Sequence, residues 1–183
     1  MSTHAARWMP PRLRRDFAIF RRPLNARDRL PPRLVSAEAV HRLALDPAAA
    51  RLAYGGAFNR IYAVPGRRAV CLYDTRAASS PCWPPGTVAK GMAVSTSFCP
   101  PSLPPGMMET VGLVPDGVRK VGMMMEDGRR LSAAVAGNFF LLDFRFGPSL
   151  PSRLTWRRAG ESHDQTAGVS PRIAKLACAS GSG

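Results

Sequence analysis

The sequence contains no long hydrophobic run. No apolar stretch reaches the ~20 residues that a membrane-spanning helix requires, so we expect no transmembrane segment. Near the N-terminus, arginines flank the apolar residues "FAIF" at 17–20, whereas a secretory signal has ~7–15 apolar residues in a row. We therefore expect a cytoplasmic protein by default, and an extracytoplasmic one if the start codon is misassigned.

The sequence also lacks the common metal-binding and catalytic motifs. Its four cysteines are widely spaced with no CxxC pair, and its three histidines lie far apart, so no zinc-binding template fits. No GxSxG motif occurs, and "GLVPDG" at 112–117 precedes a strand-like segment instead of the helix that follows a phosphate-binding loop. We expect no enzymatic activity, no metal and no cofactor.

Lysine is scarce although the chain is strongly basic. Only three of the 26 basic residues are lysine, and the formal net charge is +14 at pH 7. One interpretation is GC-rich codon usage, because arginine, alanine, proline and glycine all have GC-rich codons. The other is selection for a polyanionic partner, either nucleic acid or an anionic membrane surface.

Arginines are concentrated in residues 1–34, which we call the arm. Prolines interrupt the arm so often that it can form only short helices, one of them across Leu13–Arg22. A basic, loosely ordered segment of this kind can bind phosphates with salt-sensitive affinity and no sequence preference, or it can be a solvated arm that wraps the domain without a partner. The candidate polyanion contacts are Arg12, Arg14, Arg15, Arg21, Arg22, Arg27 and Arg29.

Two helical segments are expected after the arm. Ser36 is a favourable N-cap for the first segment. Asp46 can cap the second, with Pro47 at its first helical position, and the pattern continues over Ala48–Tyr54 until glycines end it.

The remainder of the patterned sequence predicts strands joined by tight turns. A hairpin is expected over Ile61–Tyr73, and a further strand over Gly91–Phe98. Between 111 and 146 we expect an antiparallel meander, in which Asp127-Gly128 forms a type I′ turn. The residues expected to form its turns are Pro115, Asp116, Gly117, Asp127, Gly128, Gly137 and Asn138.

These patterns define a fold class and three regions. We expect an α+β, mainly β, protein: a small antiparallel sheet, a meander of hairpins, with one or two N-terminal helices and disordered tails. The regions are the basic arm at 1–34, a small β-rich domain at 35–146 and a polar tail at 147–183, which is rich in Gly, Ser and Pro.

Three segments together resemble a group of actinobacterial hypothetical proteins. The segments are "FRRPLNARDRLPPRL" at 20–34, "VPGRRAVCL" at 64–72 and "GLVPDGVRKV…DGRRLSAAVAGNFF" at 112–140. Members of the group combine an RRP…D.LP arm, a VPG…CL hairpin and a GxVPDGV…DG…N(F/Y) β-module. The group has no established activity, so the resemblance implies only structural roles, with Gly112 and the matching turn residues shaping the module.

The resemblance also bears on the cysteines. Cys71 and Cys82 match the two cysteines of the group, which implies that they approach each other. In an oxidising compartment the pair can form a disulfide, whereas elsewhere both remain reduced thiols. The function we expect is a non-enzymatic β-rich binding or structural module. The alternative is non-specific binding of nucleic acid, or of an anionic surface, through the arm.

Overall fold

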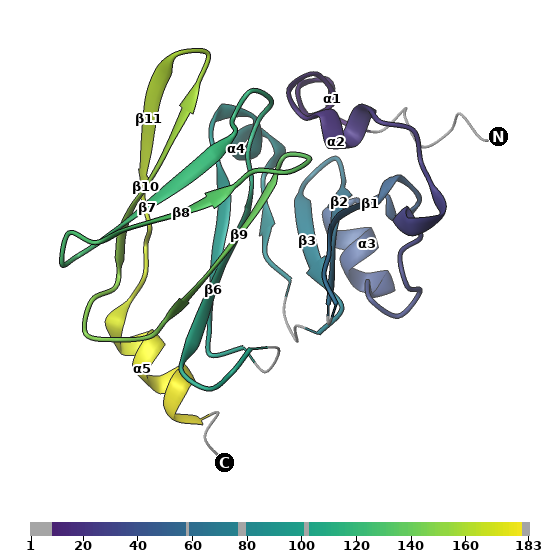
Figure 1. The fold of residues 1–183 in the computed structure, drawn as a ribbon. Helices are drawn as coiled ribbons and strands as arrows, with labels where there is room; N and C mark the ends of the chain where they lie inside the picture. Colours follow the sequence, from purple (N-terminus) through teal and green to yellow (C-terminus); the bar gives the residue numbers. More distant parts are fainter. Residues whose placement is uncertain (1–8, 58, 77–79, 101–102, 181–183) are drawn as a thin grey trace. The chain divides into compact units, whose positions relative to one another are not determined.

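The computed structural model describes residues 9–57, 59–76, 80–100 and 103–180 (Figure 1). The chain forms two compact units, Met1–Ala93 and Val94–Gly183. Both are built largely of antiparallel strands, with the short helices mostly in the first unit. The predicted mainly-β antiparallel class with N-terminal helices is therefore confirmed.

The first unit contains one antiparallel sheet with the strand order β1-β2-β3-β4. Its strands are β1 (Arg51–Gly55), β2 (Arg60–Pro65), β3 (Val70–Asp74) and β4 (Cys82–Trp83). Its helices are α1 (Pro11–Asp16), α2 (Ala18–Arg21), α3 (Ala37–Leu43) and α4 (Pro85–Lys90), with single 3₁₀ turns η2 (Ala26–Asp28) and η3 (Pro47–Ala49). Alternate residues of β2 and β3, among them Tyr62, Val64 and Cys71, form a buried cluster with residues from the segments around α3.

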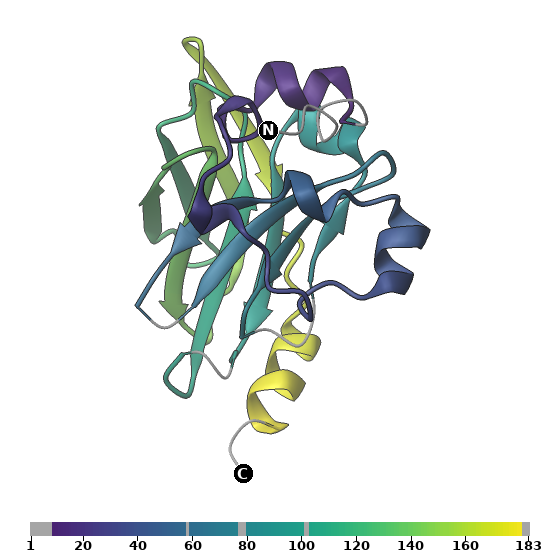
Figure 2. The ribbon, with the colours of Figure 1, turned by 90° about the vertical axis from the view of Figure 1, so that its right-hand side faces the viewer.

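The arm is more ordered than its prolines suggest. Leu13, Phe17, Ile19 and Phe20 are all buried, and α1 contacts α4 (Figure 2). These apolar residues therefore anchor the arm in the first unit. Residues 1–8 lie outside the part of the chain that the structure describes.

The helix expected over Ala48–Tyr54 is wrong. Ser36 caps α3 as expected, its hydroxyl accepting a hydrogen bond from the amide of Ala39 at 3.1 Å. Asp46, however, caps only the 3₁₀ turn η3, and the chain then extends into β1, which pairs with β2. Pairing with a neighbouring strand outweighs the helix propensity of this alanine-rich segment.

The second unit contains two antiparallel sheets. The first has the order β5-β6-β9, from β5 (Ala93–Phe98), β6 (Met107–Leu113) and β9 (Phe139–Arg145). The second has the order β11-β10-β7-β8, from β7 (Lys120–Met125), β8 (Arg130–Ala134), β10 (Pro151–Arg158) and β11 (Glu161–Thr166). The chain then forms α5 (Pro171–Ser180).

The expected single meander over 111–146 is wrong in its pairing. β6 pairs with β9 and β7 pairs with β8, so the Pro115–Gly117 turn carries the chain from one sheet to the other. The type I′ turn is also misplaced: at Asp127-Gly128 only the glycine has a positive φ. Gly137 and Asn138, with φ of 55° and 67°, form the two-residue turn of this kind between β8 and β9.

The expected disordered tail is wrong for most of its length. β10 pairs with both β7 and β11, and α5 follows. Leu154 and Trp156 of β10 are buried while Arg153 and Arg157 are exposed, which is the alternation of a strand with one face in the core. The polar and Gly/Ser-rich composition of the tail concealed that alternation.

Candidate anion-binding surface

The β11-β10-β7-β8 sheet (Figure 1) has one face of buried side chains and one face of more exposed side chains along β7 and β10. Along β7, Val121, Met123 and Met125 are buried, so Lys120 and Gly122 point to the opposite face. The register places Gly122 opposite Ser132 of β8 and Thr155 of β10. We call this surface the basic sheet face; it comprises Lys120, Gly122, Arg130, Ser132, Arg153, Thr155, Arg157, Ser162 and Asp164.

The basic sheet face lies in an open groove of about 1000 Å³. Gly122 has no side chain, and this makes the groove deeper at its floor. A β-carbon at this position would lie 2.6 Å from Oγ1 of Thr155, closer than real contacts allow. The absence of a side chain at Gly122 therefore gives the Thr155 hydroxyl its place on the floor of the groove.

The groove carries a large excess of positive charge. Five cationic side chains and one carboxylate line it; the cations are Arg119, Lys120, Arg130, Arg153 and Arg157. The carboxylate of Asp164 lies 3.6 Å from Arg153, and both side chains are well exposed. Arg157 donates to the carbonyl of Gly160 at 3.0 Å. Arg119, Lys120 and Arg130 form no ion pair with any residue that the structure describes.

Hydroxyl groups accompany these cations. Ser132, Thr155 and Ser162 all line the groove, and each hydroxyl can both donate and accept hydrogen bonds. The indole of Trp156 and the imidazole of His163 stack with their ring centroids 5.6 Å apart. Both residues also line the groove, although they alternate with Thr155 and Asp164 along their strands.

In contrast, several of the predicted arm arginines are engaged within the arm. Arg22 forms an ion pair with Asp28, with Nη2 2.5 Å from Oδ1. Arg21 donates to the backbone carbonyls of Arg14 and Arg15, and Arg15 pairs with Asp16 at 3.1 Å. The remaining predicted contacts, Arg12, Arg14, Arg27 and Arg29, have exposed side chains.

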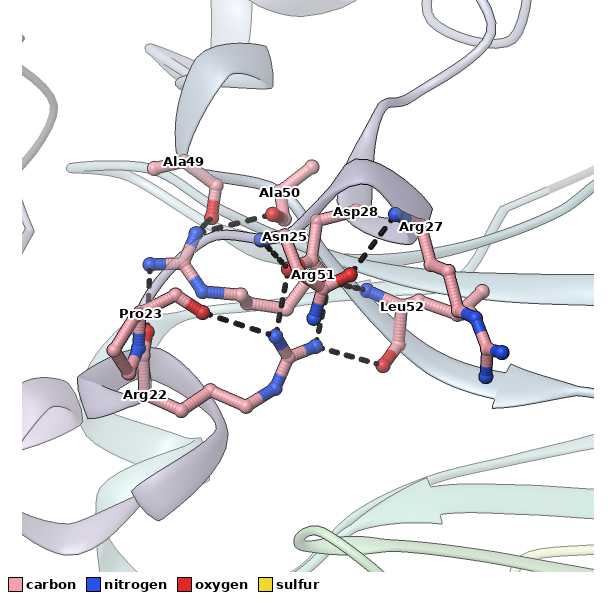
Figure 3. Close-up of polar contacts among 9 residues, drawn as sticks. All are labelled: Arg22, Pro23, Asn25, Arg27, Asp28, Ala49, Ala50, Arg51 and Leu52. Atoms are coloured by element: carbon pink, nitrogen blue, oxygen red, sulfur yellow. Dashed lines mark hydrogen bonds and ion pairs between the residues drawn. The ribbon is translucent and has the colours of Figure 1, made fainter. Parts of the chain in front are cut away.

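Asp28 links the arm to β1 (Figure 3). Its carboxylate accepts hydrogen bonds from both terminal nitrogens of Arg22 and from the amides of Asn25 and Leu52. Burial alone would raise the pKa of Asp28, but these hydrogen bonds together with the charge of Arg22 outweigh burial and hold the pKa below its ordinary value. The guanidinium of buried Arg51 donates to the carbonyls of Ala49 and Ala50.

The four cysteines form two disulfides. Cys71 is bonded to Cys82 within the first unit, joining β3 to β4. Cys99 is bonded to Cys178 within the second unit, joining the segment after β5 to α5. The sequence offered no signal for the second pair, because 79 positions separate its members.

The predicted turn residues stabilise turns of the backbone and do not form the candidate binding site. Asn138 is buried and donates through its amide to the carbonyl of Val114 at 3.0 Å and to the carboxylate of Asp116 at 2.8 Å. Asp127 instead accepts from Arg129 at 2.7 Å, which lowers the pKa of Asp127. Within the described ranges, no group of three or more His, Cys, Asp or Glu residues is arranged to hold a metal ion.

Comparison of the chain with protein-family models, with curated proteins and with solved structures gives no significant match. The likeness to actinobacterial hypothetical proteins therefore stays a resemblance. In the part of the chain that the structure describes, no helix is both long enough and apolar enough to cross a membrane.

Proposed function

We propose that this protein is a non-enzymatic binding module that holds an anionic polymer on its basic sheet face. The observation that carries the proposal is the set of five cationic side chains gathered in one groove against a single carboxylate. A groove of one charge concentrates ligands of the opposite charge and accelerates their association. Arginine predominates among the five, and its planar guanidinium can hold a carboxylate or phosphate through two hydrogen bonds.

A second candidate function is nucleic-acid binding through the arm. It is supported by the exposure of Arg12, Arg14, Arg27 and Arg29. The basic sheet face is the stronger candidate because four of the five cations in the groove lie on paired strands, whose backbones hold them at fixed spacings; they are Lys120, Arg130, Arg153 and Arg157. Side chains held in place by a rigid element lose less entropy when a ligand binds.

The test compares two double variants that each remove two positive charges. Arg130→Ala/Arg157→Ala changes the basic sheet face, and Arg12→Ala/Arg14→Ala changes the arm. Binding of fluorescent anionic polymers, both nucleic acid and acidic polysaccharide, is followed by anisotropy over a salt titration from 50 mM. The groove variant should weaken binding by at least ~10-fold and flatten the salt dependence, since fewer counterions are released.

The arm variant should bind as the wild type does. If only the arm variant loses affinity for the polymer, the polymer binds to the arm and not to the basic sheet face. If no anionic polymer binds wild-type protein at 50 mM salt, where charge contacts are strongest, both candidate functions are wrong.

A further inference from the structure

Resting on the proposed function, we infer that the polymer held by the basic sheet face is an acidic polysaccharide and not a nucleic acid. Three independent features of the molecule lead to this ligand class: the disulfides, the chemistry of the groove surface and the kind of cation that it presents.

The disulfides indicate where the protein acts. The two bonds together use all four cysteines of the chain. Cys82 is exposed, so soluble thiols can reach the bond that it makes with Cys71. Disulfides persist in oxidising compartments and are rare in the reducing cytosol, where most nucleic acid is found. Outside the cytosol, the abundant anionic polymers are polysaccharides and related glycopolymers.

The groove surface is unsuited to bases. Single-stranded nucleic acids are held largely by stacking of bases on exposed aromatic rings. The aromatic residues that line the groove, Trp156 and His163, stack on each other, so each ring covers one face of the other. Trp156 is also buried and His163 is half-buried, so among the described residues lining the groove no fully exposed aromatic ring is offered to a base.

The groove surface offers what an acidic sugar requires. A sugar ring presents hydroxyls that donate and accept, and Ser132, Thr155 and Ser162 provide hydroxyls of the same kind beside the cations. Four of the five cations are arginines, which match the two oxygens of a carboxylate. Arg153 and Arg157 are four residues apart on β10, about 13 Å at the usual strand rise, so they can hold separate charged units of one extended chain.

The experiment uses the full chain with its disulfides intact, as verified by mass spectrometry. Four fluorescein-labelled probes with equal numbers of charges are titrated at 50 and 150 mM salt: an oligogalacturonate, a sulfated dextran oligomer, a random DNA duplex and a random single strand. We expect the carboxylated glycan to bind at least ~10-fold more tightly than either DNA. In addition, Arg130→Lys/Arg157→Lys keeps the charge but removes the paired hydrogen bonds, and it should reduce oligogalacturonate affinity at least ~5-fold.

The outcomes separate this inference from the proposed function. One outcome is that a DNA probe binds as tightly as the glycans or more tightly, with the groove variant weakening that binding. In that case the assignment of an acidic polysaccharide as the ligand is wrong, whereas the proposal of anion binding at the groove stands. If the lysine variant binds oligogalacturonate as well as the wild type does, recognition of the carboxylate by arginine is overturned. If none of the probes binds, the proposed function itself fails.

Discussion

Arg22 and Asp28 face each other in a two-point ion pair, with nitrogen–oxygen distances of 2.6 and 2.5 Å. Asp28 is buried, and its carboxylate also accepts a hydrogen bond from the amide of Leu52 in β1 at 2.8 Å. One carboxylate thus joins the arm to the sheet of the first unit. The arm is in this way a structural part of that unit, which leaves fewer of its arginines available for a partner.

The ion pair predicts that Asp28→Asn lowers the free energy of unfolding substantially. The substitution leaves Arg22 without its counter-charge and exchanges a strong acceptor of four hydrogen bonds for an amide. Removing one partner of a buried pair costs about 3–5 kcal/mol, and the partial exposure of Arg22 reduces this to about 2–3 kcal/mol. Urea unfolding measures the loss.

Glu38→Gln is the matched control. Glu38 pairs with Arg42 at 3.7 Å, but both side chains are well exposed. An exposed pair of this kind on a helix contributes about 0.3–0.5 kcal/mol. Equal effects of the two substitutions would contradict the role assigned to Asp28.

The lowered pKa of Asp28 predicts how stability depends on pH. A carboxylate whose pKa is lower in the folded state stabilises the fold fully above its unfolded pKa, near the ordinary value of 3.8. That stabilisation is lost as the pH falls through the folded pKa. The difference in unfolding free energy between wild type and Asp28→Asn should be constant from pH 5 to 7 and shrink below pH 4. A difference that grows on acidification would reverse the assigned direction.

Local sequence signals predicted those parts of the fold that neighbouring residues determine. The Ser36 cap, the strands around Val64 and Cys71 and the turn at Gly137-Asn138 all follow from a few adjacent side chains. Which strands pair is a different matter. β6 turns away from β7 to pair with β9, because long-range packing of the two sheets, which no short motif records, decides it.

The basic sheet face was missed for a related reason. Arg153, Thr155 and Arg157 alternate with Leu154 and Trp156, a period of two that indicates a strand. The polar, Gly/Ser/Pro-rich composition around this segment predicts a disordered tail and conceals that alternation. The alternation alone indicates a strand at β10, whereas the position of β10 beside β7 depends on tertiary pairing.

The disulfide between Cys99 and Cys178 predicts a substantial contribution to stability. It closes a loop of 79 residues, and restricting so long a loop in the unfolded chain stabilises the fold by about 4 kcal/mol in the chain-entropy treatment. Cys99→Ala/Cys178→Ala should lose an amount of this order in urea unfolding without reductant. In excess dithiothreitol the variant and wild type should differ by less than about 1 kcal/mol. A difference that persists there would show that side-chain packing, and not the cross-link, is responsible.

Asn138 should tolerate few replacements. It combines a φ of 67° with two hydrogen bonds from its amide, so Asn138→Ala loses both the conformational match and the bonds. We expect Asn138→Ala to cost about 2–3 kcal/mol and Asn138→Gly, which accepts the backbone conformation, about 1–2 kcal/mol. Thermal unfolding measures both. Asn138→Asp keeps the shape but faces Asp116 with a like charge, so above pH 5 it should be less stable than at pH 3, relative to wild type.

The contact of Gly122 with Thr155 predicts a coupling that can be measured. An alanine at 122 places its β-carbon 2.6 Å from Oγ1 of Thr155, so the threonine must change rotamer or the strands must shift. Overpacking of this kind costs about 1–2 kcal/mol in Gly122→Ala. Thr155→Ala removes the obstructing oxygen, and the double variant should recover at least half of that loss, a coupling that a double-mutant cycle isolates.

The same pair of substitutions separates stability from binding, because the double variant regains much of its stability but has lost the hydroxyl at the floor of the groove. It should therefore bind oligogalacturonate several-fold more weakly than the wild type. Full affinity in the double variant would exclude Thr155 as a contact and confine recognition to the surrounding cations.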